Sequence, residues 1–241
     1  MISLFLVLSS ALSLQEEKSA DKVAAEALEA FHKAFKGTEA EKLVAVEDLA
    51  KVQHPRTASK LAALLPAAEP TSVRVVAAKA LGGFGEHKRV AAAGLVNALA
   101  STTKEAAVFG AICESLGKLG ESVVLPALAR HFEEKDEAVA RRAIEAAGKI
   151  GTAPGVDLLI ALLARQEKIL KSQSGQASVG YSDPNRGAGV VAAPDLRLHD
   201  RAQSLVNGAN AALKEATKES HTTSEAWSAW WSRNKAGFKK S

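Results

Sequence analysis

A thirteen-residue pattern occurs three times in the centre of this 241-residue chain. Its copies begin at Val73, Val108 and Val139, and a weaker copy precedes them by 32 residues. In each copy the apolar residues fall at positions i, i+4, i+7, i+8 and i+11, which places them on one stripe of an α-helix rather than on alternate positions of a strand. A short repeated helix of this kind buries its stripe only against neighbouring repeats, so the pattern predicts an array of stacked units.

Each copy ends on a glycine that we expect to close the helix in the left-handed conformation. These structural turn residues are Gly85, Gly120 and Gly151. A second glycine stands three residues earlier, inside the last helical turn, where it costs about 1 kcal/mol relative to alanine. We expect another backbone to pack closely against the helix at that position, because only glycine leaves room for it and the contact would offset the cost.

A second helical pattern follows each copy, so the repeating unit is a pair of helices joined by a tight turn. After Phe84 the second pattern comes two residues late, which predicts a longer turn around residues 86–89. The 48 alanines make up about a fifth of the chain and favour helix over strand. The predicted fold is therefore all-α: a right-handed α-solenoid of stacked antiparallel helix pairs, with about four pairs in residues 38–171.

The motif V-R-x-x-A-x-x-A-L-G-x-[aliphatic or Phe]-G resembles the HEAT repeat of the short, alanine-rich type that is also found in phycobilisome lyases. The resemblance implies an α-solenoid, but HEAT arrays include adaptors, enzymes and structural proteins alike. The whole layout is similar to exported bacterial HEAT-repeat proteins that carry a low-complexity insert and a C-terminal helix with the motif W-x-x-W-W. The matching residues here are Trp227, Trp230 and Trp231.

The first residues of the chain are typical of a secretory signal. Residues 1–13 carry no charged side chain, and Ala11 and Ser13 are small residues at −3 and −1 of a cleavage point before Leu14. The apolar run is too short to span a bilayer. We therefore expect a cleaved signal peptide over 1–13 and an exported protein, periplasmic or extracellular. No Lys or Arg precedes the run, and membrane attachment through an uncleaved N-terminus is the alternative.

The segments outside the repeats have distinct patterns. Residues 14–37 predict an N-terminal capping helix, and Thr38 with Glu41 forms a capping-box pattern that starts the next helix. Residues 172–195 are rich in Gly, Ser and Ala and predict a low-complexity insert, either disordered or a binding loop. Residues 196–241 predict a helical cap. Its three tryptophans share one helix face, either as an aromatic platform for a sugar or base or, as we favour, as a seal on the last repeat.

The sequence offers no pattern for catalysis or for a cofactor. The six histidines form no metal-binding motif and stand at positions that are not equivalent between repeats, and the single Cys113 lies at an apolar helix position. Residues 197–241 hold 8 Lys and Arg against 4 Asp and Glu, an interleaved pattern typical of a solvated helix surface rather than of a phosphate-binding track. We expect no catalytic residue, metal, cofactor, small-molecule ligand, nucleic acid or membrane span.

These observations predict a non-catalytic scaffold or adaptor of the cell envelope that binds another protein, whose identity the sequence does not indicate. Polar positions in or beside the second helices supply the candidate contact residues: Arg56, Lys60, Lys88, Arg130, His131 and Arg165. Tyr181 and Arg186 in the insert are further candidates. An enzyme or an enzyme-assembly subunit on the same scaffold, similar to the lyases, is one alternative. A structural component of a large envelope complex is another.

The cleavage point leads to a direct prediction. We expect the mature chain to begin at Leu14, because signal peptidases require small side chains at the two positions that Ala11 and Ser13 occupy. Intact-mass spectrometry of the protein purified from its own cells measures this. A mass that includes Met1 would instead support attachment through the retained apolar segment.

Overall fold

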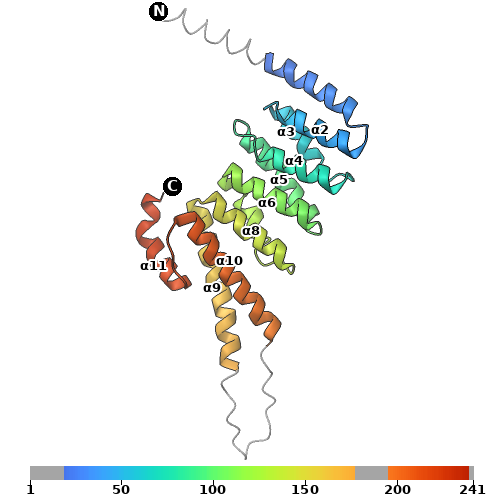
Figure 1. Cartoon of the computed structure of the whole chain (residues 1–241). Coiled ribbons are helices and arrows are strands. Elements are labelled where there is room, and N and C mark those ends of the chain that lie inside the picture. Colours follow the sequence, from blue (N-terminus) through green and yellow to red (C-terminus); the bar gives the residue numbers. More distant parts are fainter. Residues whose placement is uncertain (1–18, 177–194, 239–241) are drawn as a thin grey trace, which may run out of the picture. The chain divides into compact units, whose positions relative to one another are not determined.

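The computed structural model describes residues 19–176 and 195–238 (Figure 1). The predicted signal peptide, 1–13, and the insert residues Tyr181 and Arg186 lie outside these ranges. All regular secondary structure within them is helical. The chain divides into two compact units, Met1–Glu121 and Ser122–Ser241.

The first unit consists of helix pairs that stack in chain order. Its helices are residues 19–34, α2 (Glu39–Ala50), α3 (Pro55–Ala63), α4 (Thr71–Leu81), α5 (Lys88–Thr102) and α6 (Ala106–Leu119). The first helices of successive pairs, α2, α4 and α6, pack on one another, and the second helices α3 and α5 do the same (Figure 1). Their shared seam is the core, in which Leu61, Leu81 and Ile112 are fully buried.

The second unit has a similar order of packing within itself and contains the two longest described helices, α9 and α10. Its elements are a 3-10 turn (Ser122–Val124), α7 (Leu125–Ala129), α8 (Glu137–Ile150), α9 (Ala153–Gln176), α10 (Leu196–Thr217), α11 (Ser224–Asn234) and a 3-10 turn (Lys235–Gly237). Helix α10 packs against both α8 and α9, and α11 packs against α9 (Figure 1). Helix α9 runs past Ser172, where the insert was predicted to begin, because regular helical hydrogen bonding extends to Gln176.

Each unit is thus built from helices that pack against their neighbours in the chain, which confirms the predicted all-α, HEAT-like solenoid fold.

Local sequence signals determine where helices begin, as the N-terminus of α2 shows. The Thr38 hydroxyl accepts a hydrogen bond from the Glu41 backbone N–H, and the Glu41 carboxylate accepts one from the Thr38 N–H at 2.7 Å. The hydrogen bonds from Thr38 hold the pKa of Glu41 below its usual value. This cap therefore contributes to stability at neutral pH and loses that contribution as the pH falls through the lowered pKa.

The closing glycines do not all behave as predicted. Gly120 and Gly151 end α6 and α8 in the left-handed conformation, with φ of 69° and 59°. The prediction for Gly85 is wrong, because α4 already ends at Leu81 and Gly82 follows it in the right-handed conformation. After α4 the chain forms a turn with local backbone hydrogen bonds; in one of them the Phe84 N–H donates to the Leu81 carbonyl at 3.2 Å.

Two of the three inner glycines, Gly82 and Gly148, mark close approaches of the kind that the sequence predicted. A Cβ added at Gly82, directly after α4, would lie 2.8 Å from the Ser115 Oγ and 3.1 Å from the Ser115 Cα in α6. A Cβ added at Gly148 in α8 would lie 2.8 Å from the Cα and the carbonyl oxygen of Ala212 in α10. The backbones of successive first helices therefore lie almost in contact, at α4 and α6 in the first unit and at α8 and α10 in the second.

This contact predicts opposite effects for the same substitution at different glycines. Gly82→Ala and Gly148→Ala should each destabilise the fold by about 1–3 kcal/mol, because the added methyl overpacks a contact with no free space. Gly208→Ala in α10 should stabilise it by about 0.5–1 kcal/mol, because its Cβ would meet only Ile144 at 3.9 Å and alanine is the better helix former.

Thermal unfolding followed by circular dichroism measures the three variants, and each kcal/mol shifts Tm by about 2–4 °C in a chain of this size. An unchanged or raised Tm for Gly148→Ala would contradict the close approach.

Candidate functional site

Helix α3, a second helix of the first unit, carries two of the predicted contact residues on one face. Helix α3 begins at Pro55, and the His54 side chain caps it by accepting a hydrogen bond from the Arg56 N–H at 3.2 Å. Arg56 and Lys60 follow one turn apart. The Lys60 Nζ lies 5.5 Å from the centre of the Phe31 ring in the helix of residues 19–34. The two side chains line a hollow of about 490 Å³ between that helix and α3.

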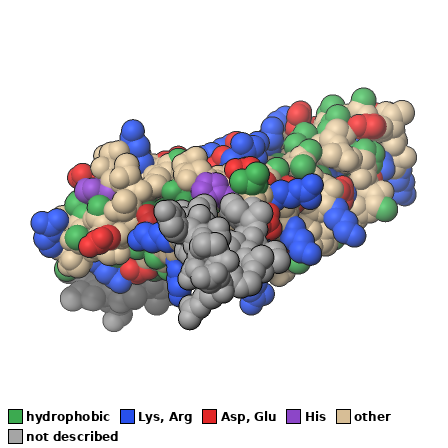
Figure 2. Space-filling view, turned by 90° about the horizontal axis from the view of Figure 1, so that it is seen from below, with side chains coloured by type: hydrophobic (Ala, Val, Ile, Leu, Met, Phe, Trp, Pro, Cys, Tyr) green, Lys and Arg blue, Asp and Glu red, His purple; other side chains and the backbone are tan. Residues whose placement is uncertain are grey.

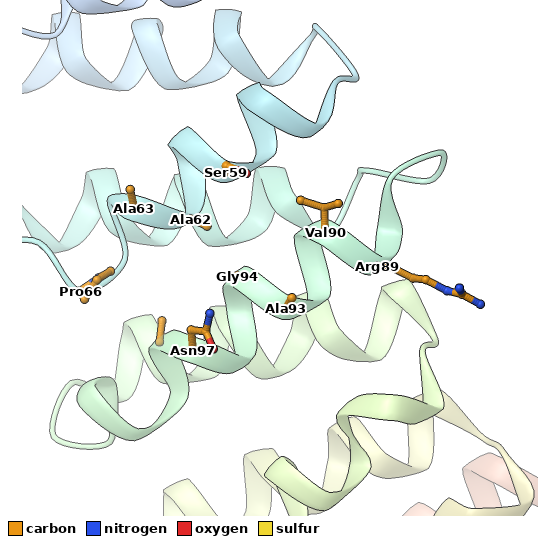
Figure 3. A pocket seen from close by; sticks show the side chains of 10 residues that line it. Ser59, Ala62, Ala63, Pro66, Arg89, Val90, Ala93, Gly94 and Asn97 are labelled. Carbon is orange, nitrogen blue, oxygen red and sulfur yellow. The ribbon is translucent and has the colours of Figure 1, made fainter.

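A larger groove lies on the other side of α3, between α3 and α5 (Figure 3). We call it the α3–α5 groove; its volume is about 620 Å³ and it is lined by Ser59, Ala62, Ala63, Pro66, Arg89, Val90, Ala93, Gly94, Asn97 and Ala98. It shares Ser59 and Ala63 with the smaller hollow. The two depressions therefore flank α3.

Small side chains give the α3–α5 groove its form. A Cβ added at Gly94 would overlap with the Cβ of Ala62, so α5 lies against α3 at the closest distance that side chains permit. Ala63 and Ala93 are exposed and rise little above the helix backbones. The groove thus presents short, apolar side chains to solvent, and stacked helices hold it in place.

The charged residues that line the two depressions are all basic: Arg56, Lys60 and Arg89. The Arg89 side chain is 88% exposed at the start of α5, where it extends away from the groove floor (Figure 3). Lys88, a predicted contact residue, lies beside it but binds Glu121 at 3.0 Å. Arg89 is a site residue that sequence reasoning missed, although its place next to Lys88 was a signal.

A comparison with known protein families identifies the repeats in part of the chain. The model of the family described as HEAT repeats matches residues 92–178, from within α5 to the end of α9. The chain therefore contains HEAT repeats over these residues. HEAT repeats generally mediate protein–protein interaction. None of the curated proteins matches the chain.

Charges on the surface of the protein are mixed. Lys and Arg side chains are interspersed with Asp and Glu over the face that Figure 2 shows. Within the described ranges, no helix has both the length and the apolar character needed to cross a membrane. That the protein binds no nucleic acid stays a prediction.

The prediction that the histidines stand at non-equivalent repeat positions is wrong for two of them. His54 and His87 stand at the equivalent position in two successive repeats, the N-cap of the second helix, and their rings lie 6.2 Å apart. The late start of α5 hid this equivalence in the sequence. Among residues 19–176 and 195–238, no three His, Cys, Asp or Glu side chains converge on a point that could hold a metal ion.

The contact residues predicted in the second unit do not form a comparable surface. Arg130 is exposed after α7, and the exposed Arg165 donates to Glu133 at 3.2 Å. His131 is 8% exposed and Phe132 beside it is buried, so little of the His131 side chain faces solvent, and its role as a contact residue stays a prediction. Tyr181 and Arg186 lie outside the described residues.

The tryptophans of α11 pack inward against α9 and α10. Trp227 is fully buried and its Nε1–H donates to Asn210 at 2.8 Å; Trp231 is 5% exposed and donates to Asp157 at 2.7 Å. Trp230 lies between them, half-buried, with its ring centre 6.0 Å from that of Trp227. Because two of the three rings have no free face, the geometry supports a seal on the last repeat rather than an aromatic platform.

This arrangement predicts unequal effects along one helix face. Trp227→Ala should destabilise the protein by about 3–5 kcal/mol, because it leaves a large cavity and orphans the Asn210 partner. Trp230→Ala should cost about 1 kcal/mol or less, because its ring is half exposed. Thermal unfolding of the two variants compares them directly. Equal losses, or a larger loss for Trp230→Ala, would show that α11 does not seal the unit through Trp227.

Proposed function

We propose that this HEAT-repeat protein is a non-catalytic scaffold or adaptor that binds a protein partner through the α3–α5 groove and works, after export, in the cell envelope. The observation that carries the proposal is the groove itself, about 620 Å³ in volume and open to solvent beside exposed Ala63 and Ala93. Exposed, contiguous apolar surface bordered by polar side chains is typical of an interaction site.

The rigidity of the groove favours binding. Its walls are two helices in contact at Gly94 and Ala62, and the seam beneath them is fully buried at Leu61 and Leu95. A partner therefore meets a preformed surface and orders few protein groups on binding, which reduces the entropic cost of association. Packing in the repeat supplies this preorganisation.

The side chains that line the groove favour binding over catalysis. Its only hydroxyl, that of Ser59, donates to the Pro55 carbonyl oxygen at 2.9 Å. No lining residue is a carboxylate, a histidine or a thiol, so the groove holds no general base beside a nucleophile. The uncharged segment 1–13, with its small residues before Leu14, supports export.

Photo-cross-linking in the native cells tests the groove as the binding site. A photoreactive amino acid is placed at Ala63 or Ala93 in the groove, or at the exposed Ala107 of α6, which lines neither depression. We expect Ala63 and Ala93 to give the same protein adduct in the envelope fraction and Ala107 to give none, because cross-linking requires direct contact.

A blocking variant serves as the internal control. Ala93→Trp fills the groove without changing charge and should abolish the adduct formed from Ala63, whereas Ala107→Trp should leave it unchanged. Equal adducts from all three positions, or an Ala63 adduct that survives Ala93→Trp, would rule out the groove as the partner's site.

A further inference from the structure

We infer that the segment bound in the α3–α5 groove is an acidic amphipathic α-helix of the partner protein. This inference rests on the proposed function, because it names the chemistry of the partner at that same site. Three features of the described residues carry it: the sign of the charges at the rim, the shortage of hydrogen-bonding groups on the walls, and the size of the side chains on the floor.

The rim favours a negatively charged partner. Arg89 lines the groove, Arg56 and Lys60 line the adjoining hollow on the other side of α3, and neither depression is lined by an Asp or Glu. The nearest carboxylate of Arg89 is that of Glu121, which lies 3.8 Å away and is closer to Lys88, at 3.0 Å. Arg89, with 88% of its side chain exposed, therefore remains accessible to a partner's carboxylate.

The charged residue that lines the groove, Arg89, lies at one end of it, and Arg56 of the adjoining hollow lies at the same end of α3. Arg56 lies in the first turn of α3 and Arg89 in the first turn of α5. The rings of His54 and His87, which precede these two turns, are 6.2 Å apart, so the two helix N-termini lie side by side. Helix N-termini carry partial positive charge, which adds to that of the arginines. The other end, near Pro66 and Ala98, carries no charged lining residue.

The walls favour a helix over an extended strand. Backbone carbonyls and N–H groups of α3 and α5 are used within the helices, and Ser59 already donates to Pro55. Asn97 is the one side-chain amide on the walls. An extended peptide would bury backbone N–H and C=O groups against this surface without partners, which costs stability for each group. A helix satisfies its own backbone and needs only apolar contact.

The floor accommodates a helix at close range. Ala62, Ala63, Ala93 and Gly94 present at most a methyl group each, so a partner helix can approach as closely as α3 and α5 approach each other. The α5 residues that line the groove run from Arg89 to Ala98, which at 1.5 Å per residue is about 15 Å, so a partner helix of about ten residues fills the groove.

A random library of 16-residue peptides displayed on phage tests the inference with the intact chain. Peptides are selected on the wild-type protein after depletion on Ala93→Trp, which removes those that bind elsewhere. We expect enrichment of peptides with net negative charge and apolar residues at i, i+3, i+4 and i+7. Fluorescence anisotropy of labelled peptides then gives Kd. Arg89→Glu should weaken binding about tenfold or more, and Ala107→Glu should have no effect.

Two changes to the selected peptides separate charge from conformation. Replacing Glu and Asp by Lys should abolish binding to the wild type and restore it to Arg89→Glu, because the attraction then acts between the swapped charges. A central proline should abolish binding, because it breaks the helix. Circular dichroism confirms that each protein variant stays folded, which is expected since Ala93, Arg89 and Ala107 are exposed.

Several outcomes would overturn the inference. Enrichment of neutral or basic peptides, or of peptides that tolerate the proline, would leave the groove as the binding site but contradict its acidic helical ligand. If no peptide is enriched on the wild-type protein, the acidic helical ligand is contradicted. The photo-cross-linking experiment then still tests, by itself, whether the groove binds a protein partner. Self-association that light scattering detects in the wild type and not in Ala93→Trp would assign the groove to a second copy of the chain.

Discussion

At Gly82 the backbone of α4 lies so close to Ser115 of α6 that no methyl group fits between them, and Gly148 repeats this contact against Ala212 in the second unit. The distance between successive first helices is thereby fixed within each unit. In the first unit the second helices follow the same spacing, with Gly94 against Ala62. Other parts of the stack, including the buried seam and the surface above it, depend on these contacts because close-packed helices transmit a change in spacing to their neighbours.

The same constraint that stabilises the first unit also shapes its surface. Small side chains are required where α3 meets α5, and small side chains continue to the exposed edge at Ala63 and Ala93, where they leave a groove. Basic side chains stand at the start of both helices, where the N-terminal partial charges already favour anions. A surface of this kind offers shape, apolar contact and one sign of charge, and these properties suit recognition of a helix better than they suit chemistry on a small molecule.

Much of the fold could be predicted from the sequence, but less of the candidate site. The helix pairs follow from apolar periodicity, and the turns at Gly120 and Gly151 follow from a local backbone requirement. The prediction for Gly85 was wrong because α4 ends at Leu81, directly before two other glycines, and another helix approaches the first of these. The burial of His131 was not indicated by the sequence, because its position beside a short helix does not show whether a polar side chain faces solvent. Arg56 and Lys60 do line one hollow.

What the sequence determined by itself is therefore local: all-helical structure, the repeat, the capping box at Thr38 and the positions where only glycine fits. These features depend on hydrogen bonds and dihedral angles within a few residues, which a linear pattern records. Only the tertiary structure decided the α3–α5 groove, the pairing of His54 with His87 and the burial of Trp227 against Asn210. Each of these joins residues from different helices. Their proximity depends on how closely the helices pack, and side-chain volume at the contact sets that distance.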